Sequence, residues 1–132
     1  MRDNLRPMRP LYITLCCVLL AAVACTKEKP MLKATYHASC RACIVSYAVG
    51  PQQSHKDTLK GVVDPISGIP AIVDTTWQEE VQDGDNLFLR GCQLDSVFYG
   101  EIDLNISGDV SPLSDTATAD SCAEINTPGH AR

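Results

Sequence analysis

The residues of this sequence best suited to chemistry are the cysteines at positions 40, 43, 92 and 122. Cys40 and Cys43 form a C-x-x-C pattern, which in thiol oxidoreductases opens a helix whose dipole lowers the pKa of the first cysteine. With His37 three residues earlier, the same cysteines could supply three of the four ligands of a tetrahedral zinc site. The residue types therefore allow two chemistries, thiol redox exchange and zinc binding.

Structural disulfides are a stronger interpretation of these cysteines than either kind of site. The residues after Cys43, IVSYAV, are typical of a strand, so no helix follows the C-x-x-C pattern. A zinc site would need His55 or Cys92 as its fourth ligand, and three ligands within seven extended residues make an awkward geometry. An even number of cysteines in an exported chain usually forms disulfides. We therefore predict that Cys40, Cys43, Cys92 and Cys122 are disulfide-bonded, with no metal and no cofactor.

The pairing of the four cysteines stays open at this level, because four cysteines allow three connectivities. A bond between Cys40 and Cys43 needs a tight bend, since three extended residues span more than the roughly 7 Å between Cα atoms that a disulfide tolerates. We therefore expect this pair to bond to Cys92 and Cys122, in either order. Closing loops of about 50 residues in this way would stabilise the fold by roughly 4 kcal/mol.

Two further patterns bear on chemistry, and each has a simpler explanation. Asp83–Asn86 begins like a calcium-binding loop, but Arg90 and Gly91 stand where later acidic ligands are required, so a hairpin turn is the better interpretation. The three histidines are expected in separate segments, and no serine has the turn context of a catalytic nucleophile. We predict that the protein is not an enzyme.

Residues 1–24 have the three parts of a secretory leader. Three arginines precede an apolar run from Leu11 to Ala24, and small residues stand before Cys25. The run is shorter than the ~20 residues needed to cross a membrane. We therefore expect residues 1–24 to be a signal peptide that is cleaved before Cys25.

The end of this leader, Ala-Val-Ala-Cys, resembles the lipobox of bacterial lipoproteins. The resemblance implies that Cys25 carries acyl chains such as palmitate, which hold the mature chain in a membrane, with residues 25–31 as a lipidated tether. Thr26 stands where an aspartate would signal retention in the inner membrane. By the same resemblance, the protein is expected in the outer membrane, facing either the periplasm or the cell surface. A signal peptide without lipidation is the alternative.

The charge of the mature chain argues against some partners. Residues 1–24 contain three Arg and one Asp, so their removal changes the formal net charge from −5 to −7. An acidic protein without runs of Lys or Arg is repelled by nucleic acids and by anionic lipid. We therefore expect no nucleic-acid partner.

Residues 32–126 are expected to form one domain, followed by a flexible tail at 127–132. The segments with strand character are Leu32–Ala38, Cys43–Val49, Ala71–Val81, Asn86–Cys92 and Ser96–Ser107, with an edge strand near Thr58–Val63 and a last strand near Ala119–Ile125. Several short strands and no sustained helical period predict an all-β fold, an Ig-like antiparallel β-sandwich of about seven strands. The expected core residues are Val45, Tyr47, Trp77, Leu87, Leu89, Ile102 and Leu104.

The order of these segments resembles small β-sandwich envelope lipoproteins of the MmpS-like, transport-accessory type. The residues that carry the resemblance are IVSY at 44–47, Trp77, the Asp83–Asp85 turn before LFLRG, and GEIDLNIS at 100–107. It spans about residues 32–125, with Gly108-Asp109 in place of Asp-Gly and an insertion at Lys60–Pro70. The resemblance implies a non-catalytic accessory module that contacts another envelope protein of transport type, through a sheet edge or the insertion.

Four tripeptides of Asp followed by Thr or Ser resemble the O-glycosylation sequon of exported proteins in Bacteroidota-type bacteria. The candidate acceptors are Thr58, Thr75, Ser96 and Thr116. Two other functions stay open. One is a surface module that recognises host or glycan ligands, for which Tyr99 is the candidate exposed aromatic residue. The other is a metal or redox site at Cys40 and Cys43.

Overall fold

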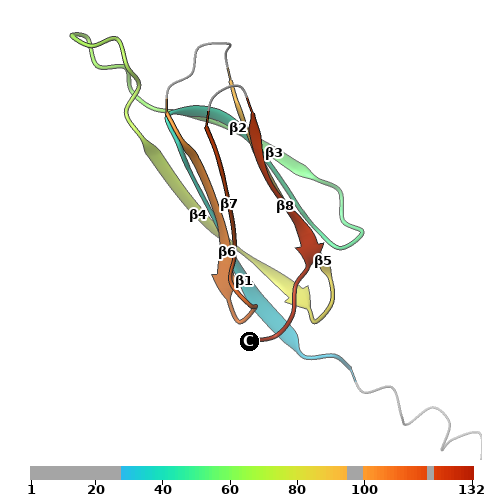
Figure 1. Ribbon diagram of the computed structural model, residues 1–132. Helices are drawn as coiled ribbons and strands as arrows, with labels where there is room; N and C mark the ends of the chain where they lie inside the picture. Colours follow the sequence, from blue (N-terminus) through green and yellow to red (C-terminus); the bar gives the residue numbers. More distant parts are fainter. Residues whose placement is uncertain (1–27, 95–99, 119–120) are drawn as a thin grey trace, which may run out of the picture.

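The computed structural model describes residues 28–94, 100–118 and 121–132. These residues form eight β-strands in two antiparallel four-stranded sheets that pack face to face (Figure 1). The strands are β1 (Met31–Cys40), β2 (Ala42–Val49), β3 (His55–Lys60), β4 (Val73–Gln82), β5 (Asn86–Gln93), β6 (Ile102–Gly108), β7 (Leu113–Ala117) and β8 (Cys122–Pro128). The predicted all-β sandwich is confirmed, with eight strands where about seven were expected.

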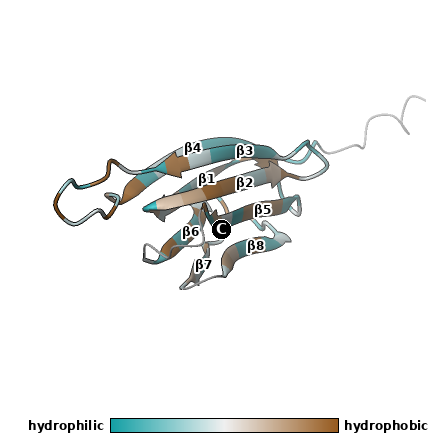
Figure 2. Cartoon of the chain, turned by 90° about the horizontal axis from the view of Figure 1, so that it is seen from above, coloured by the Kyte–Doolittle hydropathy of each residue, from teal (hydrophilic) through white to brown (hydrophobic). Residues whose placement is uncertain are grey.

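The chain crosses repeatedly between the two sheets. One sheet has the strand order β4-β1-β6-β7 and the other has the order β3-β2-β5-β8, so only β2–β3 and β6–β7 are hairpins. Figure 2 shows β4 and β3 at one side of the sandwich and β7 and β8 at the other. The sheets approach each other at the β7–β8 side, where the Glu124 N–H donates to Asp115 Oδ2 at 2.7 Å. Along the β3–β4 side, fewer residues of the two sheets lie close together, so we call it the open side.

The core lies between the inward faces of both sheets. Five of the seven expected core residues are buried: Val45, Leu87, Leu89, Ile102 and Leu104. Tyr47 and Trp77 are partly exposed and pack against this core from the β3–β4 side. Tyr36 on β1 is fully buried at 0% exposure and was not among the expected core residues. Its neighbours of the same face, Ala34 and Ala38, are small, so the strand has weak hydrophobic patterning in the sequence.

Gly91 allows the two sheets to pack closely. A Cβ atom at this position of β5 would lie 2.9 Å from Ile102 Cγ2 and 3.3 Å from Leu104 Cδ2, both on β6 in the opposite sheet. The first distance is shorter than real Cβ contacts and the second is tight, so any larger residue at position 91 would force these β6 side chains to shift.

Some expected boundaries differ from the structure. The edge strand β3 covers residues 55–60 and not 58–63, β6 begins at Ile102, and β8 ends at Pro128. Strand β7 was not expected at all, because Leu113 and Ala117 are its only apolar residues. The expected strand start at Ser96 lies outside the described residues.

The turn at Asp83–Asp85 is present but does not close a hairpin. It leads from β4 in one sheet to β5 in the other. Gly84 has a φ of +90°, Gln82 N–H donates to Asp85 Oδ2 at 2.8 Å, and Asp83 Oδ1 accepts the N–H of Ala131. Both aspartates therefore shape the turn and its contact with the C-terminus.

The prediction of a flexible tail at residues 127–132 is wrong. Thr127 and Pro128 belong to β8, and Gly129 exchanges backbone hydrogen bonds with the Asp83–Asp85 turn. The carbonyl of His130 accepts the N–H of Ser111 at 2.8 Å, and the N–H of Arg132 donates to Asp109 O at 3.0 Å. The sequence of this segment, which is small and polar, did not indicate these hydrogen bonds, because backbone groups and not side chains form them.

Candidate functional site

The four cysteines of the domain form two disulfides, Cys40–Cys43 and Cys92–Cys122. The expected bridges between the first pair and the second are therefore wrong. The chain bends at Arg41 as it passes from β1 in one sheet to β2 in the other. Because of this bend, the Cα atoms of Cys40 and Cys43 lie only 6.2 Å apart, a separation that a disulfide tolerates. In an extended chain the same atoms would lie too far apart for a bond.

The closed C-x-x-C bridge limits the chemistry available there. Cys40 and Cys43 are buried, at 1% and 0% exposure. In this oxidised form neither sulfur is a thiolate, so zinc binding would first require reduction. Thiol–disulfide exchange would instead require an incoming thiolate to reach these buried sulfurs. His37 Nε2 lies 3.4 Å from Asp74 Oδ1 on the neighbouring strand. Within residues 28–94, 100–118 and 121–132, no group of three or more His, Cys, Asp or Glu side chains could hold a metal ion.

The two disulfides differ in access, so they are expected to differ in rate of reduction. Cys122 is exposed and Cys92 is half-buried, and Arg90 Nη2 lies 3.7 Å from Cys122 Sγ. A nearby guanidinium stabilises a leaving thiolate. We expect dithiothreitol to reduce Cys92–Cys122 at least about tenfold faster than the buried bridge, which must wait for local opening. Timed alkylation followed by peptide mass analysis measures both rates.

The matched control for this experiment is the same reaction in denaturant, where both bridges should react at similar rates. Labelling that appears first at Cys40 or Cys43 in the folded protein would contradict the prediction.

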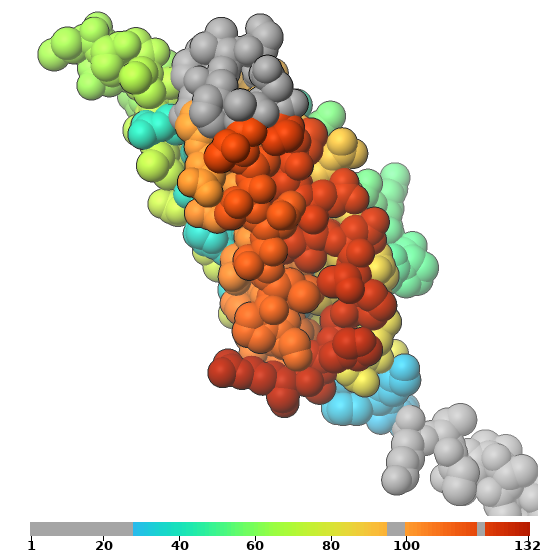
Figure 3. Space-filling view, in the orientation of Figure 1, coloured from blue at the N-terminus to red at the C-terminus, as the bar shows by residue number. Residues whose placement is uncertain are grey.

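Residues 61–72, between β3 and β4, form a projecting loop that we call the apolar finger (Figures 1 and 3). Its exposed aliphatic side chains are Val62, Val63, Ile66, Ile69 and Ile72. Ile66 is 95% exposed and Val62 is 84% exposed. The sixth large apolar residue that is exposed in the described part of the chain is Met31, at the start of β1.

Hydrogen bonds give the finger an ordered shape. Asp64 N–H donates to Ile69 O at 3.0 Å and Ala71 N–H donates to Val62 O at 2.9 Å, so the two arms pair. At the tip, Asp64 Oδ1 accepts the N–H groups of Ile66 and Ser67 at 2.7 and 3.3 Å. These bonds hold the pKa of the Asp64 carboxyl below its ordinary value. The Ile66 side chain is therefore presented by a defined turn.

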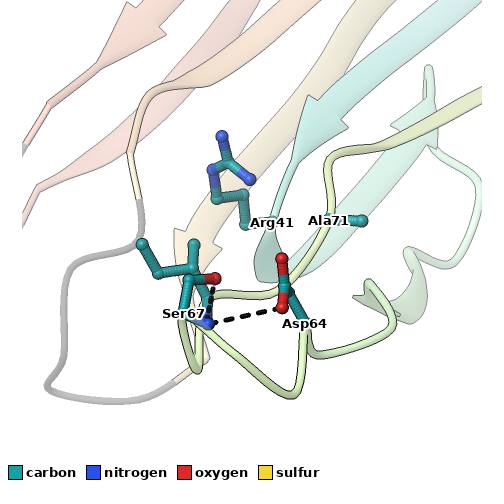
Figure 4. Close-up of a pocket in the computed structure, with 5 residues that line it drawn as sticks. Arg41, Asp64, Ser67 and Ala71 are labelled. Carbon is teal, nitrogen blue, oxygen red and sulfur yellow. Dashed lines mark hydrogen bonds between the residues drawn. The ribbon is translucent and has the colours of Figure 1, made fainter.

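Arg41 joins the base of the finger to the corner between the sheets. Its Nη1 donates to Pro70 O at 2.7 Å, and its backbone carbonyl accepts the N–H of Gly61 at 2.9 Å. A surface hollow of about 310 Å³ lies here, lined by Arg41, Asp64, Ser67, Ile69 and Ala71 (Figure 4). The Cys40–Cys43 bridge flanks Arg41 on both sides, so the disulfide restrains the residue that positions the finger.

A second feature, which we call the aromatic seam, consists of Tyr47, His55 and Trp77 on the open β3–β4 side. Tyr47 lies 4.8 Å from Trp77 and 5.1 Å from His55 between ring centroids. Burial, and then the nearby Glu79 and Asp57 carboxylates, raise the pKa of Tyr47 above its ordinary value. The buried Nε1 of Trp77 has no hydrogen-bond acceptor among the described residues.

The other candidate residues are dispersed. Thr58 on β3 and Thr116 on β7 are exposed, whereas Thr75 on β4 is partly buried. Ser96, Tyr99 and Cys25 lie outside the residues that the structure describes. The sequence singled out the Lys60–Pro70 insertion, most of which is the finger. It missed Arg41, whose role depends on a corner between sheets that only the fold shows.

No protein-family model, curated protein or solved structure matches this chain. The similarity to MmpS-like lipoproteins therefore stays a prediction. In the described ranges, no helix is long and apolar enough to cross a membrane.

Proposed function

We propose that this protein is a lipid-anchored, non-catalytic module of the outer membrane that binds another envelope protein through the apolar finger. The observation that carries the proposal is the concentration of exposed aliphatic side chains on the finger, with Ile66 95% exposed at its tip. Apolar side chains gathered on one projecting element mark interaction surfaces. The resemblance to transport-accessory lipoproteins supports a partner of transport type.

The position of the finger suits a partner beyond the anchoring membrane. Strand β1 begins beside the tether, where Met31 pairs with Gln82, and ends where Cys40 pairs with Val73 at the root of the finger. Ten strand residues span about 30 Å. A lipid on Cys25 would hold the first end at the bilayer, and the finger would then point away from it (Figure 1).

The charge of the finger favours a protein over a second lipid surface. Residues 62–72 contain no Lys or Arg, and Asp64 is their only charged residue. Loops that insert into anionic membranes usually combine apolar and basic side chains. A concave apolar pocket on a protein would enclose Ile66 and its neighbours without requiring basic residues.

Site-specific photo-crosslinking in the native envelope tests this proposal. We expect a photoreactive residue at Val62 to form one major adduct with another envelope protein, and the same residue at exposed Ser114 on β7 to form none. Adding Ile66→Asp should lower the yield from Val62 at least about tenfold, because a carboxylate would enter an apolar pocket, whereas Ile66→Leu should preserve it. Identical adducts from both positions, or an undiminished yield with Ile66→Asp, would refute the proposal.

A further inference from the structure

Strand β4 has a long outer edge with unused backbone groups. Among the described residues it pairs only with β1, through ten consecutive residue pairs. At the end of β4, the Gln82 N–H donates to Asp85 Oδ2 and the Gln82 C=O accepts the N–H of Asp85, so both groups point to the following turn. Since backbone groups alternate in direction along an antiparallel strand, those of residues 74, 76, 78 and 80 also point away from β1.

This edge lacks most of the features that normally block strand addition, although Glu79 on its inner face is a charge of the kind that can protect an edge. Natural edge strands are often short, bulged, or protected by proline or lysine. The sequence of β4, VDTTWQEEVQ, contains no proline, lysine or arginine, and its pairing with β1 is continuous. Its charged residues are all acidic, namely Asp74, Glu79 and Glu80.

The aromatic seam lies beside this edge, and its Trp77 belongs to the inner face of β4. Trp77 and Glu79 share that face and are partly exposed, and Tyr47 faces Trp77 from the other sheet at 4.8 Å. Aromatic faces next to carboxylates attract cationic side chains by cation–π and charge interactions. In a strand added to β4, alternate side chains would lie beside this seam on the inner face, and the others would lie beside Asp74 and Glu80 on the outer face.

We propose that the outer edge of β4 binds an extended segment of a partner protein, with Lys or Arg at alternate positions, as an added strand. Its backbone completes the open hydrogen bonds of β4, and its basic side chains meet Trp77 and Glu79. A second copy of this chain is a poorer occupant, because its β4 would bring three more carboxylates to the same edge. This site is separate from the apolar finger, so a failed test of one site does not decide the other.

Binding of a synthetic peptide to the purified protein tests the proposal. The probe is an acetylated and amidated (Lys-Thr)₄ peptide, and (Glu-Thr)₄ is its matched control. Fluorescence of Trp77, the only tryptophan of the chain, reports binding at the seam. We expect (Lys-Thr)₄ to bind with an affinity that falls as salt is added, and (Glu-Thr)₄ not to bind.

Thr76→Pro and Thr76→Ala form a matched pair of variants. Proline removes an outward N–H without removing a bond to β1, and proline is tolerated on edge strands. We expect Thr76→Pro to weaken binding at least about tenfold and Thr76→Ala less than about twofold. Glu79→Gln should weaken binding about threefold or more, and Ser114→Ala at an exposed position of β7, outside both proposed surfaces, should leave it unchanged.

Hydrogen exchange on the unmodified protein gives a measurement that does not depend on the folding of a variant. The peptide should newly protect the amides of Thr76, Gln78 and Glu80. Equal binding of the two peptides, equal affinity of the Thr76 variants, or new protection confined to β3, β7 or β8 would overturn the proposal.

Discussion

Replacing Cys25 by serine is expected to move the protein almost completely from the membrane fraction to the soluble fraction. For this experiment, residues 1–24 are exchanged for a secretory leader that is cleaved before position 25 without lipidation. Two or three acyl chains give stable anchoring at roughly 0.8 kcal/mol per buried methylene, whereas a single chain is marginal. Without residues 1–24 the chain would carry a formal net charge of −7, which also opposes adsorption to anionic lipid.

Sedimentation of membranes after a high-salt wash measures this effect, and the intact mass of the native protein shows whether Cys25 carries acyl chains. Thr26→Ala with the native leader is the control and should stay with the membrane. Retention of the serine variant in the washed membranes, or a native mass equal to that of the bare peptide, would contradict lipid anchoring.

The fold was predictable where strands bury large aliphatic residues at alternate positions. In β6, Ile102, Leu104 and Ile106 alternate with polar residues and are all buried. In β7 the same signal is weak, because Leu113 and Ala117 are separated by Ser, Asp and Thr. That strand is specified by its pairing with β6 in the folded sheet.

The candidate site was predictable only in part, for a similar reason. The apolar residues of the Lys60–Pro70 insertion are visible in the sequence. The Cys40–Cys43 bond and the contact of Arg41 with Pro70 depend on a bend between two sheets. If the chain between Cys40 and Cys43 were extended, the bond between them could not form. The spacing of the two cysteines does not show that the chain changes sheets between them.

The largest loss of stability is expected for Tyr36→Ala. Tyr36 is fully buried, and its ring lies 6.0 Å from the rings of both Tyr47 and Trp77, nearly parallel to Trp77 at 14°. Removing a buried aromatic side chain costs about 3–5 kcal/mol in the free energy of unfolding. A domain of this size has only about 5–15 kcal/mol in total. Denaturant unfolding should show a lower midpoint with little change in slope, and a loss below about 1 kcal/mol would contradict this prediction.

Tyr36→Phe separates the contribution of the ring from that of the hydroxyl group. The hydroxyl donates to Ala48 O at 3.4 Å, which is long, so the variant should lose no more than about 1 kcal/mol at neutral pH. Burial, and then Glu79 and Asp85, raise the pKa of the Tyr36 phenol above its ordinary value of about 10. Below a pH of about 10 the phenol is neutral in both states, and its contribution to stability is fully present. As the pH rises further, the Tyr36 phenol ionises first in the unfolded chain, so this stability is lost. Above that pH the unmodified protein should lose stability more steeply than Tyr36→Phe, and parallel declines would show that Tyr36 ionises as readily in the folded protein as in the unfolded chain.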